Sequence, residues 1–250
     1  MNNVLEIRHL CKSYNSLNGE IDVVQDVSFD VFENEFISII GTSGCGKSTI
    51  LNIIGGLDKD YTGSVNLSSG ITTSYMLQDD ALFPWLSVLD NACLGLKVQK
   101  KLSSENVDYV KYLLKKYGLE EFQNKKVNSL SGGMRQRVAL IRTIATKPKL
   151  VLLDEPFSAL DYQTRLNVSN DVYHILKEEG ITAIMVTHDI GEAASISSRV
   201  IVMTKRPTHI KNIYDMKYEV ENMEPLDKRK SPLFNLYYEK LWSDIDESKW

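Results

Sequence analysis

The segment from Gly41 to Ser48 constrains this chain more than any other, because its sequence GTSGCGKS matches GxxxxGK[ST] at every fixed position. A short β-branched and aromatic run precedes it at residues 35–40, and apolar residues with helical spacing follow it at residues 49–54. A strand, a glycine-rich turn and a helix in this order form an anion site, because backbone N–H groups and the positive end of the helix surround a phosphate. The pattern therefore predicts a nucleotide-phosphate site in an α/β fold.

Within this loop, Lys47 is expected to reach the β- and γ-phosphates, and the Ser48 hydroxyl to coordinate Mg²⁺. Cys45 stands inside the loop, so we expect a thiol reagent to block ATP binding and ATP to protect against it. The residues predicted to hold the nucleotide here are Gly41, Thr42, Ser43, Gly44, Cys45, Gly46, Lys47, Ser48 and Thr49.

Composition excludes several classes of protein. At 250 residues, with 43% apolar and 25% charged residues, the chain resembles a globular protein with an ample core. A net charge of −4 gives no electrostatic reason to expect nucleic acid as a partner. No run approaches the roughly 18–20 apolar residues that cross a bilayer, and the start lacks a signal-peptide pattern. Three scattered cysteines form no disulfide or zinc pattern, so we expect reduced thiols in an intracellular protein.

The first third of the chain predicts strands on either side of the phosphate loop. Residues 4–10 and 21–31 alternate apolar and polar side chains, which is typical of antiparallel strands, and Asn18-Gly19 is expected to turn the chain between them. Further short strands are expected within residues 61–76. From about residue 87 the pattern becomes helical, with a helix expected from Glu105 to Tyr117. We therefore expect an inserted helical subdomain over about residues 87–147.

The α/β pattern returns at residue 150. Continuous apolar runs at residues 150–153 and 182–186 indicate parallel strands buried on both faces, with a helix from Tyr162 to Glu179 between them. Another strand is expected at residues 200–203. Residues 1–205 then form the main domain, and residues 206–250 a C-terminal extension packed on it. Its helix is expected to begin at Ser231-Pro232, with one apolar side made of Leu233, Leu236, Tyr237 and Leu241.

Acidic and basic side chains follow two of these buried strands. Asp154 comes directly after residues 150–153, at the edge of a parallel sheet where ligands bind. It is expected to bind Mg²⁺ opposite Ser48. Glu155 is then placed to polarise a water attacking the γ-phosphate, an assistance worth about 10²–10⁴ in rate. His188 ends the next strand and is expected to hydrogen-bond the γ-phosphate and position that water.

A family resemblance rests on residues 130–137, LSGGMRQR, where Ser131 can cap a helix and Gly132-Gly133 expose backbone N–H groups. This segment resembles the signature motif of ATP-binding cassette (ABC) ATPases, and the other motifs follow in that family's order. The resemblance implies a P-loop fold with a mostly parallel central sheet, an antiparallel β subdomain and an inserted helical subdomain. It also implies a head-to-tail dimer, in which Ser131, Gly132 and Gly133 close over ATP held by the second copy.

The same resemblance assigns three further segments. Tyr14 matches the aromatic residue that stacks on adenine, and Gln78 matches the glutamine that contacts Mg²⁺ and the attacking water. Residues 158–161, SALD, match the loop that carries signals across the dimer. The cofactors implied are ATP and Mg²⁺, the reaction is ATP hydrolysis coupled to transport, and Glu155, His188 and Gln78 are the expected catalytic residues.

A finer resemblance covers residues 78–91, which are similar to the ATPases of nitrate, sulfonate and taurine importers. It implies permease subunits in the membrane, a solute-binding protein outside it, and a peripheral position on the inner face of the plasma membrane. Residues 83–86, FPWL, are then either an exposed docking patch or part of the interior of the helical subdomain. The alternatives are an importer of an unrelated solute, a soluble ABC ATPase of DNA repair or translation, and a cassette that senses nucleotide without hydrolysis.

Overall fold

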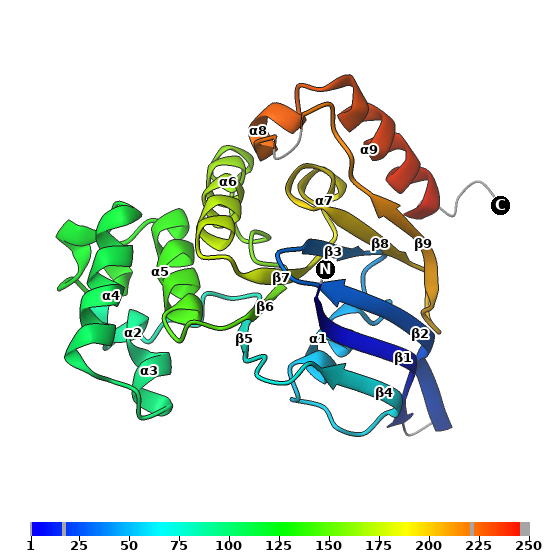
Figure 1. Ribbon diagram of the computed structural model, residues 1–250, viewed down its shortest axis with the longest axis horizontal. Coiled ribbons are helices and arrows are strands. Elements are labelled where there is room, and N and C mark those ends of the chain that lie inside the picture. The colour runs from blue at the N-terminus through cyan, green and yellow to red at the C-terminus, as the bar shows by residue number, and fades with distance from the viewer. Residues whose placement is uncertain (1, 17–18, 221–222, 246–250) are drawn as a thin grey trace.

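The computed structural model describes residues 2–16, 19–220 and 223–245, and Figure 1 shows how their helices and strands are arranged. A six-stranded sheet forms the centre. Four of its five pairings are parallel, which confirms the predicted mostly parallel sheet, and the edge strand β9, which was not predicted, is antiparallel. In spatial order its strands are β5 (Thr73–Met76), β6 (Leu150–Asp154), β7 (Thr182–Thr187), β3 (Phe36–Ile40), β8 (Arg199–Met203) and β9 (Ile210–Asp215).

The middle of this sheet is buried and mostly apolar. Every residue of β3 and β7 is buried, and so are the first four residues of β6. Continuous runs of this kind form central parallel strands, because helices or a second sheet cover both faces. The three strands therefore end at one sheet edge in fixed register, with Ile40 beside Thr187 and Asp154 beside Val186.

A second sheet of three antiparallel strands lies beside the central one (Figure 1). It consists of β2 (Gly19–Phe32), β1 (Asn3–Ser16) and β4 (Thr62–Leu67). The predicted antiparallel pairing is confirmed, and Asn18 of the expected turn lies outside the described residues. Apolar side chains of β1 and β2 form one core with α1 (Lys47–Ile54) and with one face of the central sheet.

Helices form a separate group on the left of Figure 1. Ser103 caps α4 by accepting a hydrogen bond from the Asn106 N–H. The following helix buries Val138, Ile141 and Ile144. The helices of the group are α2 (Val88–Ala92), α3 (Leu94–Val98), α4 (Ser104–Lys116) and α5 (Gly132–Ile144), with the 3₁₀ turns η1 (Glu120–Phe122) and η2 (Val127–Ser129).

The other face of the central sheet carries the remaining helices: α6 (Tyr162–Glu178), α7 (Ile190–Ile196), α8 (Pro225–Lys228) and α9 (Pro232–Ile245). The buried side of α9 differs from the expected one. Phe234, Tyr237, Leu241 and Ile245 pack against α7 and β8, whereas Leu236 is 45% exposed. Several sides of this helix carry apolar residues, so its sequence alone does not determine which side is buried. The contacts with α7 and β8 determine it. No helix in the described part of the chain is long and apolar enough to cross a membrane.

Candidate active site

A cavity of about 280 Å³ lies where the chain leaves β3 and enters α1. Its wall combines the phosphate loop with residues from β1, β2 and two later loops. The lining residues are Tyr14, Val23, Ser43, Gly44, Gly46, Lys47, Ser48, Thr49, Glu155 and Arg206. Tyr14 and most of the predicted phosphate-loop residues therefore meet around one space, together with Glu155 and Arg206 from much later in the sequence.

The loop needs its glycines for conformational reasons. Gly44 has φ +74° and Gly46 has φ +122°, a region that strains residues with a Cβ. A Cβ on Gly46 would also lie 3.0 Å from the Val23 side chain. Gly46 is the N-cap of α1, so the positive end of that helix opens into the cavity. Lys47 is 5% exposed and its Nζ donates to the carbonyl oxygens of Gly41 and Thr42, both at 3.0 Å.

Ser48 and Asp154 form a pair of oxygen ligands across the cavity. The Ser48 hydroxyl donates to Asp154 Oδ1 at 3.0 Å. Burial raises the pKa of the Asp154 carboxyl, and hydrogen bonds from Ser48 and Tyr75 act against this rise. A hydroxyl and a carboxylate suit Mg²⁺, which takes its other ligands from nucleotide phosphates and water in such sites. The described residues contain no cluster of three or more His, Cys, Asp or Glu that could hold a metal alone. The pair therefore fits a metal that arrives with a nucleotide.

The three predicted catalytic side chains lie together, with His188 and Gln78 both beside the carboxylate of Glu155. His188 Nδ1 lies 3.1 Å from Glu155 Oε2, and Gln78 Nε2 lies 3.4 Å from the same oxygen. Glu155 has φ +43°, and its N–H donates to the Val186 carbonyl at 2.9 Å, which orients the turn after β6. Among the described residues no hydrogen bond joins Gln78 to Ser48 or Asp154. The structure thus brings Gln78 to the carboxylate of Glu155 rather than to the expected metal pair.

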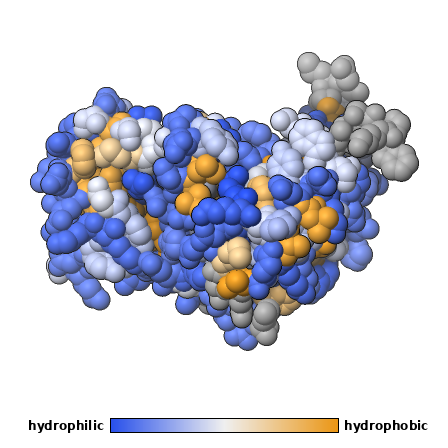
Figure 2. All heavy atoms as spheres, turned by 90° about the horizontal axis from the view of Figure 1, so that it is seen from above, coloured by the Kyte–Doolittle hydropathy of each residue, from blue (hydrophilic) through white to orange (hydrophobic). Residues whose placement is uncertain are grey.

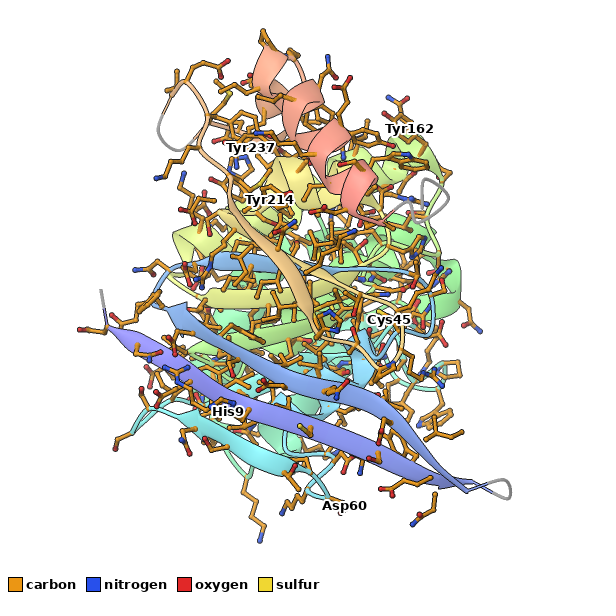
Figure 3. The ribbon with its side chains drawn as sticks, turned by 90° about the vertical axis from the view of Figure 1, so that its right-hand side faces the viewer. His9, Cys45, Asp60, Tyr162, Tyr214 and Tyr237 are labelled. Carbon is orange, nitrogen blue, oxygen red and sulfur yellow. The ribbon has the colours of Figure 1, made fainter. Side chains whose placement is uncertain are left out.

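Tyr14 forms the outer wall of the cavity with 42% of its surface exposed. Its hydroxyl donates to Asp58 Oδ2 at 3.1 Å, and Lys12 Nζ lies 4.6 Å from its ring centroid. Lys12 in turn forms ion pairs with Asp58 and Asp60. Asp60 is labelled in Figure 3. Sequence reasoning missed Lys12 and Asp58. The spacing of Lys12 and Tyr14 in β1 was the available signal, because residues two apart in a strand share a face.

The signature segment lies elsewhere in the molecule. Ser131 caps α5 by accepting from the Met134 N–H at 3.3 Å, and Gly133 packs so closely that a Cβ would lie 2.9 Å from Thr164. None of Ser131, Gly132 and Gly133 lines the cavity around Lys47. Within one chain, therefore, the two predicted anion sites do not meet.

Two residues around the loop differ from expectation. Cys45 is only 2% exposed and lies among interior side chains in Figure 3, which contradicts the expectation of a readily accessible thiol. Its side chain packs under the loop instead of facing the cavity. Arg206, to which the sequence assigned no role in the site, lines the cavity and donates to the Gly44 carbonyl from the loop after β8.

The patch at residues 83–86 is exposed. Phe83 is 37% and Trp85 66% exposed, and their ring centroids lie 5.0 Å apart. Leu82, by contrast, is 9% exposed and belongs to the core. Of the two alternatives, packing of these rings inside the helical group is therefore wrong.

Together, a phosphate loop at the end of a parallel strand, an acidic residue ending the neighbouring strand and a second carboxylate beside them define a P-loop ATPase. The family model described as ABC transporter matches residues 24–158, more than half of the chain. This chain therefore belongs to the ABC transporter family, and it is an ATP-binding and ATP-hydrolysing protein of that family.

Known proteins similar to this chain agree with that assignment. The Uncharacterized ABC transporter ATP-binding protein YtlC of Bacillus subtilis is 41% identical over 97% of this chain and 95% of its own length. The Taurine import ATP-binding protein TauB of Jannaschia sp. is 36% identical over 92% and 89%. The Spermidine/putrescine import ATP-binding protein PotA of Mycoplasma capricolum is 40% identical over 82% and 60%.

A solved structure is also similar. The ATP-binding cassette MJ0796, in a dimeric post-hydrolysis state bound to ADP and Pi, aligns with a TM-score of 0.73 and 31% identity. The alignment covers 86% of this chain and 99% of that one. The predicted fold, a P-loop ABC ATPase with an antiparallel β subdomain, is thereby confirmed.

Proposed function

We propose that this chain hydrolyses ATP at the cavity around Lys47 and uses the energy to drive import of a solute through separate membrane subunits. The observation that carries the proposal is the convergence of Gln78 and His188 on Glu155 beside the phosphate loop. A carboxylate held between a histidine and an amide can accept a proton from the attacking water. A cassette that only senses nucleotide has no need of this arrangement.

The nucleotide is expected to use the residues around the cavity in separate roles. Lys47, released from the carbonyls of Gly41 and Thr42, binds the β- and γ-phosphates, and Tyr14 stacks on adenine. Ser48 and Asp154 hold Mg²⁺, and Gln78 contacts the attacking water from its position beside Glu155. When bound, Mg²⁺ neutralises charge that develops on the phosphate oxygens.

A second copy of the chain is expected to complete the site. Ser131 is exposed at the N-terminus of α5, where backbone N–H groups can meet a γ-phosphate, but it is remote from the chain's own phosphate loop. A head-to-tail dimer brings the two together, and the dimeric state of MJ0796 supports this arrangement. ATP then favours the closed dimer because only that state offers both halves of the site.

The exposed rings of Phe83 and Trp85 are the expected contact with a permease. The backbone that leads to them is tied to α5, because Arg142 donates to the Asp80 and Ala81 carbonyls, both at 2.7 Å. Arg135 also pairs with Asp80 at 2.9 Å. A movement of this patch can therefore displace both Gln78 and α5, the helix that carries the signature segment. On this proposal the chain lies on the inner face of the plasma membrane, and an extracytoplasmic solute-binding protein delivers the cargo.

The solute is proposed to be a nitrate-, sulfonate- or taurine-like anion, which the likeness to TauB supports. A polyamine is the second candidate, because PotA is 40% identical. Solute-binding assays on the binding protein encoded beside this chain decide between them. Saturable binding of taurine or nitrate supports the first candidate, and binding of spermidine alone overturns it.

Glu155→Gln tests the enzymatic core of the proposal. We expect a loss of about 10²–10⁴-fold in ATPase rate, with ATP binding retained and a stable dimer formed in ATP, measured by phosphate release and light scattering. The exposed Glu121→Gln serves as the matched control and should behave as the wild type. A Glu155→Gln variant that hydrolyses ATP at the wild-type rate, or stays monomeric at saturating ATP, contradicts the proposal.

A further inference from the structure

A second and larger cavity, of about 860 Å³, lies on the other side of the central sheet. Its wall combines the start of β3, the end of α6, residues 216–220 and Met223. It shares no lining residue with the cavity around Lys47. Figure 2 looks down on the face that carries α8 and α9, and it shows apolar patches set in a hydrophilic surface there. The volume falls within the range of about 300–1,000 Å³ that small-molecule sites occupy.

Lys228 lines this cavity and is the feature that marks it. Its surface is 7% exposed, and its Nζ lies 5.2 Å from the Tyr218 ring centroid and 5.7 Å from that of Tyr173. Within the described chain the Nζ donates one hydrogen bond, a long one of 3.5 Å to the Ser197 carbonyl. Among the described residues no carboxylate lies within 4.0 Å of it. Buried lysines are rarely left without a charged partner, so this ammonium has unused capacity to bind an anion.

The pKa of Lys228 agrees with this description. Burial and, to a smaller extent, the nearby charge of Lys177 lower the pKa of Lys228, Glu224 opposes the fall, and the resulting pKa is about 8. Bound to an anion, the ammonium would regain the stabilisation that burial removes. The cavity therefore gains most from a ligand that brings one negative charge to this position.

The other charges that line the cavity also favour an anionic ligand. Besides Lys228 there are two lysines and two glutamates, which leaves one positive charge in excess. Glu35 is already paired with Arg199 at 2.8 Å, and Glu219 accepts a hydrogen bond from Ser231 at 2.7 Å. A cation would meet the unpaired ammonium, so the wall favours an anion.

The remaining wall favours an apolar body. Leu176, Ile181 and Met216 line the cavity, together with the rings of Tyr173 and Tyr218. These groups offer dispersion contacts and no further charge. We propose that this cavity binds a small organic monocarboxylate, with its carboxylate on Lys228 and its apolar body against Leu176, Ile181 and Met216. The site is independent of ATP hydrolysis and lies outside the nucleotide-binding residues.

Titration of the full chain with 4-phenylbutyrate and its uncharged amide tests this proposal. Binding is followed by calorimetry and by ¹³C NMR of the methionine methyl groups. Met216 lines the cavity, whereas Met76 is buried in another cluster and serves as the internal control. We expect saturable binding of the carboxylate, at least 10-fold tighter than that of the amide, with shifts at Met216 and none at Met76.

Lys228→Met keeps the length of the side chain and removes its charge, and Lys228→Arg keeps the charge. We expect the preference for the carboxylate to disappear in Lys228→Met and to persist in Lys228→Arg. Lys177→Met, at an exposed lysine of the rim, should change the affinity less than threefold. The proposal is overturned if the carboxylate does not bind, if the amide binds equally well, or if Lys228→Met keeps the preference.

Discussion

The Tyr75 hydroxyl lies 3.2 Å from Asp154 Oδ2, on the side of the carboxylate away from Ser48. It also lies 2.9 Å from Asn52 Oδ1. A hydroxyl has one proton, so it serves these two acceptors in turn, or the Asn52 amide is rotated so that its NH₂ donates to Tyr75. Tyr75 thus fixes one oxygen of Asp154 and leaves the other to Ser48 and the metal.

Tyr75→Phe removes this hydrogen bond without changing the packing of the ring. We expect the free energy of unfolding to fall by about 1–2 kcal/mol, because a buried carboxylate oxygen loses its donor. We also expect a higher Mg²⁺ concentration at half-maximal ATPase rate. Urea unfolding and Mg²⁺ titration of the ATPase measure the two effects. Tyr61→Phe is the control, since its hydroxyl bonds no described residue; equal effects of the two variants would refute a role for the Tyr75 hydroxyl.

Tyr14 is held at its hydroxyl by Asp58 and covered on one face by Lys12. Tyr14→Phe keeps a ring for adenine but loses the hydrogen bond, which is worth about 0.5–1.5 kcal/mol. We therefore expect the KM for ATP to rise roughly 2- to 10-fold with kcat nearly unchanged, and a larger rise in Tyr14→Ala. Steady-state kinetics measure both, with the exposed Tyr112→Phe as the control. A fall in kcat at constant KM would place Tyr14 in the chemical step instead.

Glu192 makes stability depend on pH. It is 3% exposed, and burial, followed by the charge of Asp189, raises its pKa to about 7. Its charged and polar neighbours are Thr187, which donates to it at 2.8 Å, Arg165 with Nε at 3.7 Å, and His188. Between the unfolded pKa near 4.5 and the folded value, the folded state binds more protons than the unfolded state. Its stability therefore falls as pH rises through this window.

Glu192→Gln removes this titration. Relative to the wild type, we expect the variant to gain about 2–3 kcal/mol in free energy of unfolding between pH 4.5 and pH 8. Urea midpoints at several pH values measure the change, with the exposed Glu121→Gln as the control. A constant difference between variant and wild type over that range would show that Glu192 is ionised in the folded protein throughout.

Burial of Cys45 changes the expected thiol chemistry. Cys45 and Cys93 are buried, and Cys11 is partly exposed. We expect iodoacetamide to label Cys11 at least 10-fold faster than Cys45, and ATP to slow only the labelling of Cys45. Peptide mass spectrometry measures each site, and Cys11→Ser should remove the fast phase. Rapid labelling of Cys45 in the native protein would mean that the loop opens readily.

Much of this protein could be predicted from local sequence. Some features depend only on neighbouring residues or on short periodic patterns, so they can be predicted without knowledge of the fold. They are the phosphate loop, the helix caps at Ser103 and Ser131, and the buried strands. Asp154, Glu155 and His188 were predictable for a related reason. Parallel strands end at one edge of a sheet, which brings the residues that follow them together.

Other features depended on which distant surfaces meet. Tyr75 and Asp58 come from separate segments and support Asp154 and Tyr14, and no local pattern distinguishes them from ordinary polar residues. The buried side of α9 and the burial of Cys45 could not be predicted either, because periodicity shows an apolar stripe but not which surface will cover it. Residues 41–48 thus determine that a phosphate can bind. The tertiary structure decides which side chains surround it, since it alone sets the distances between segments far apart in the chain.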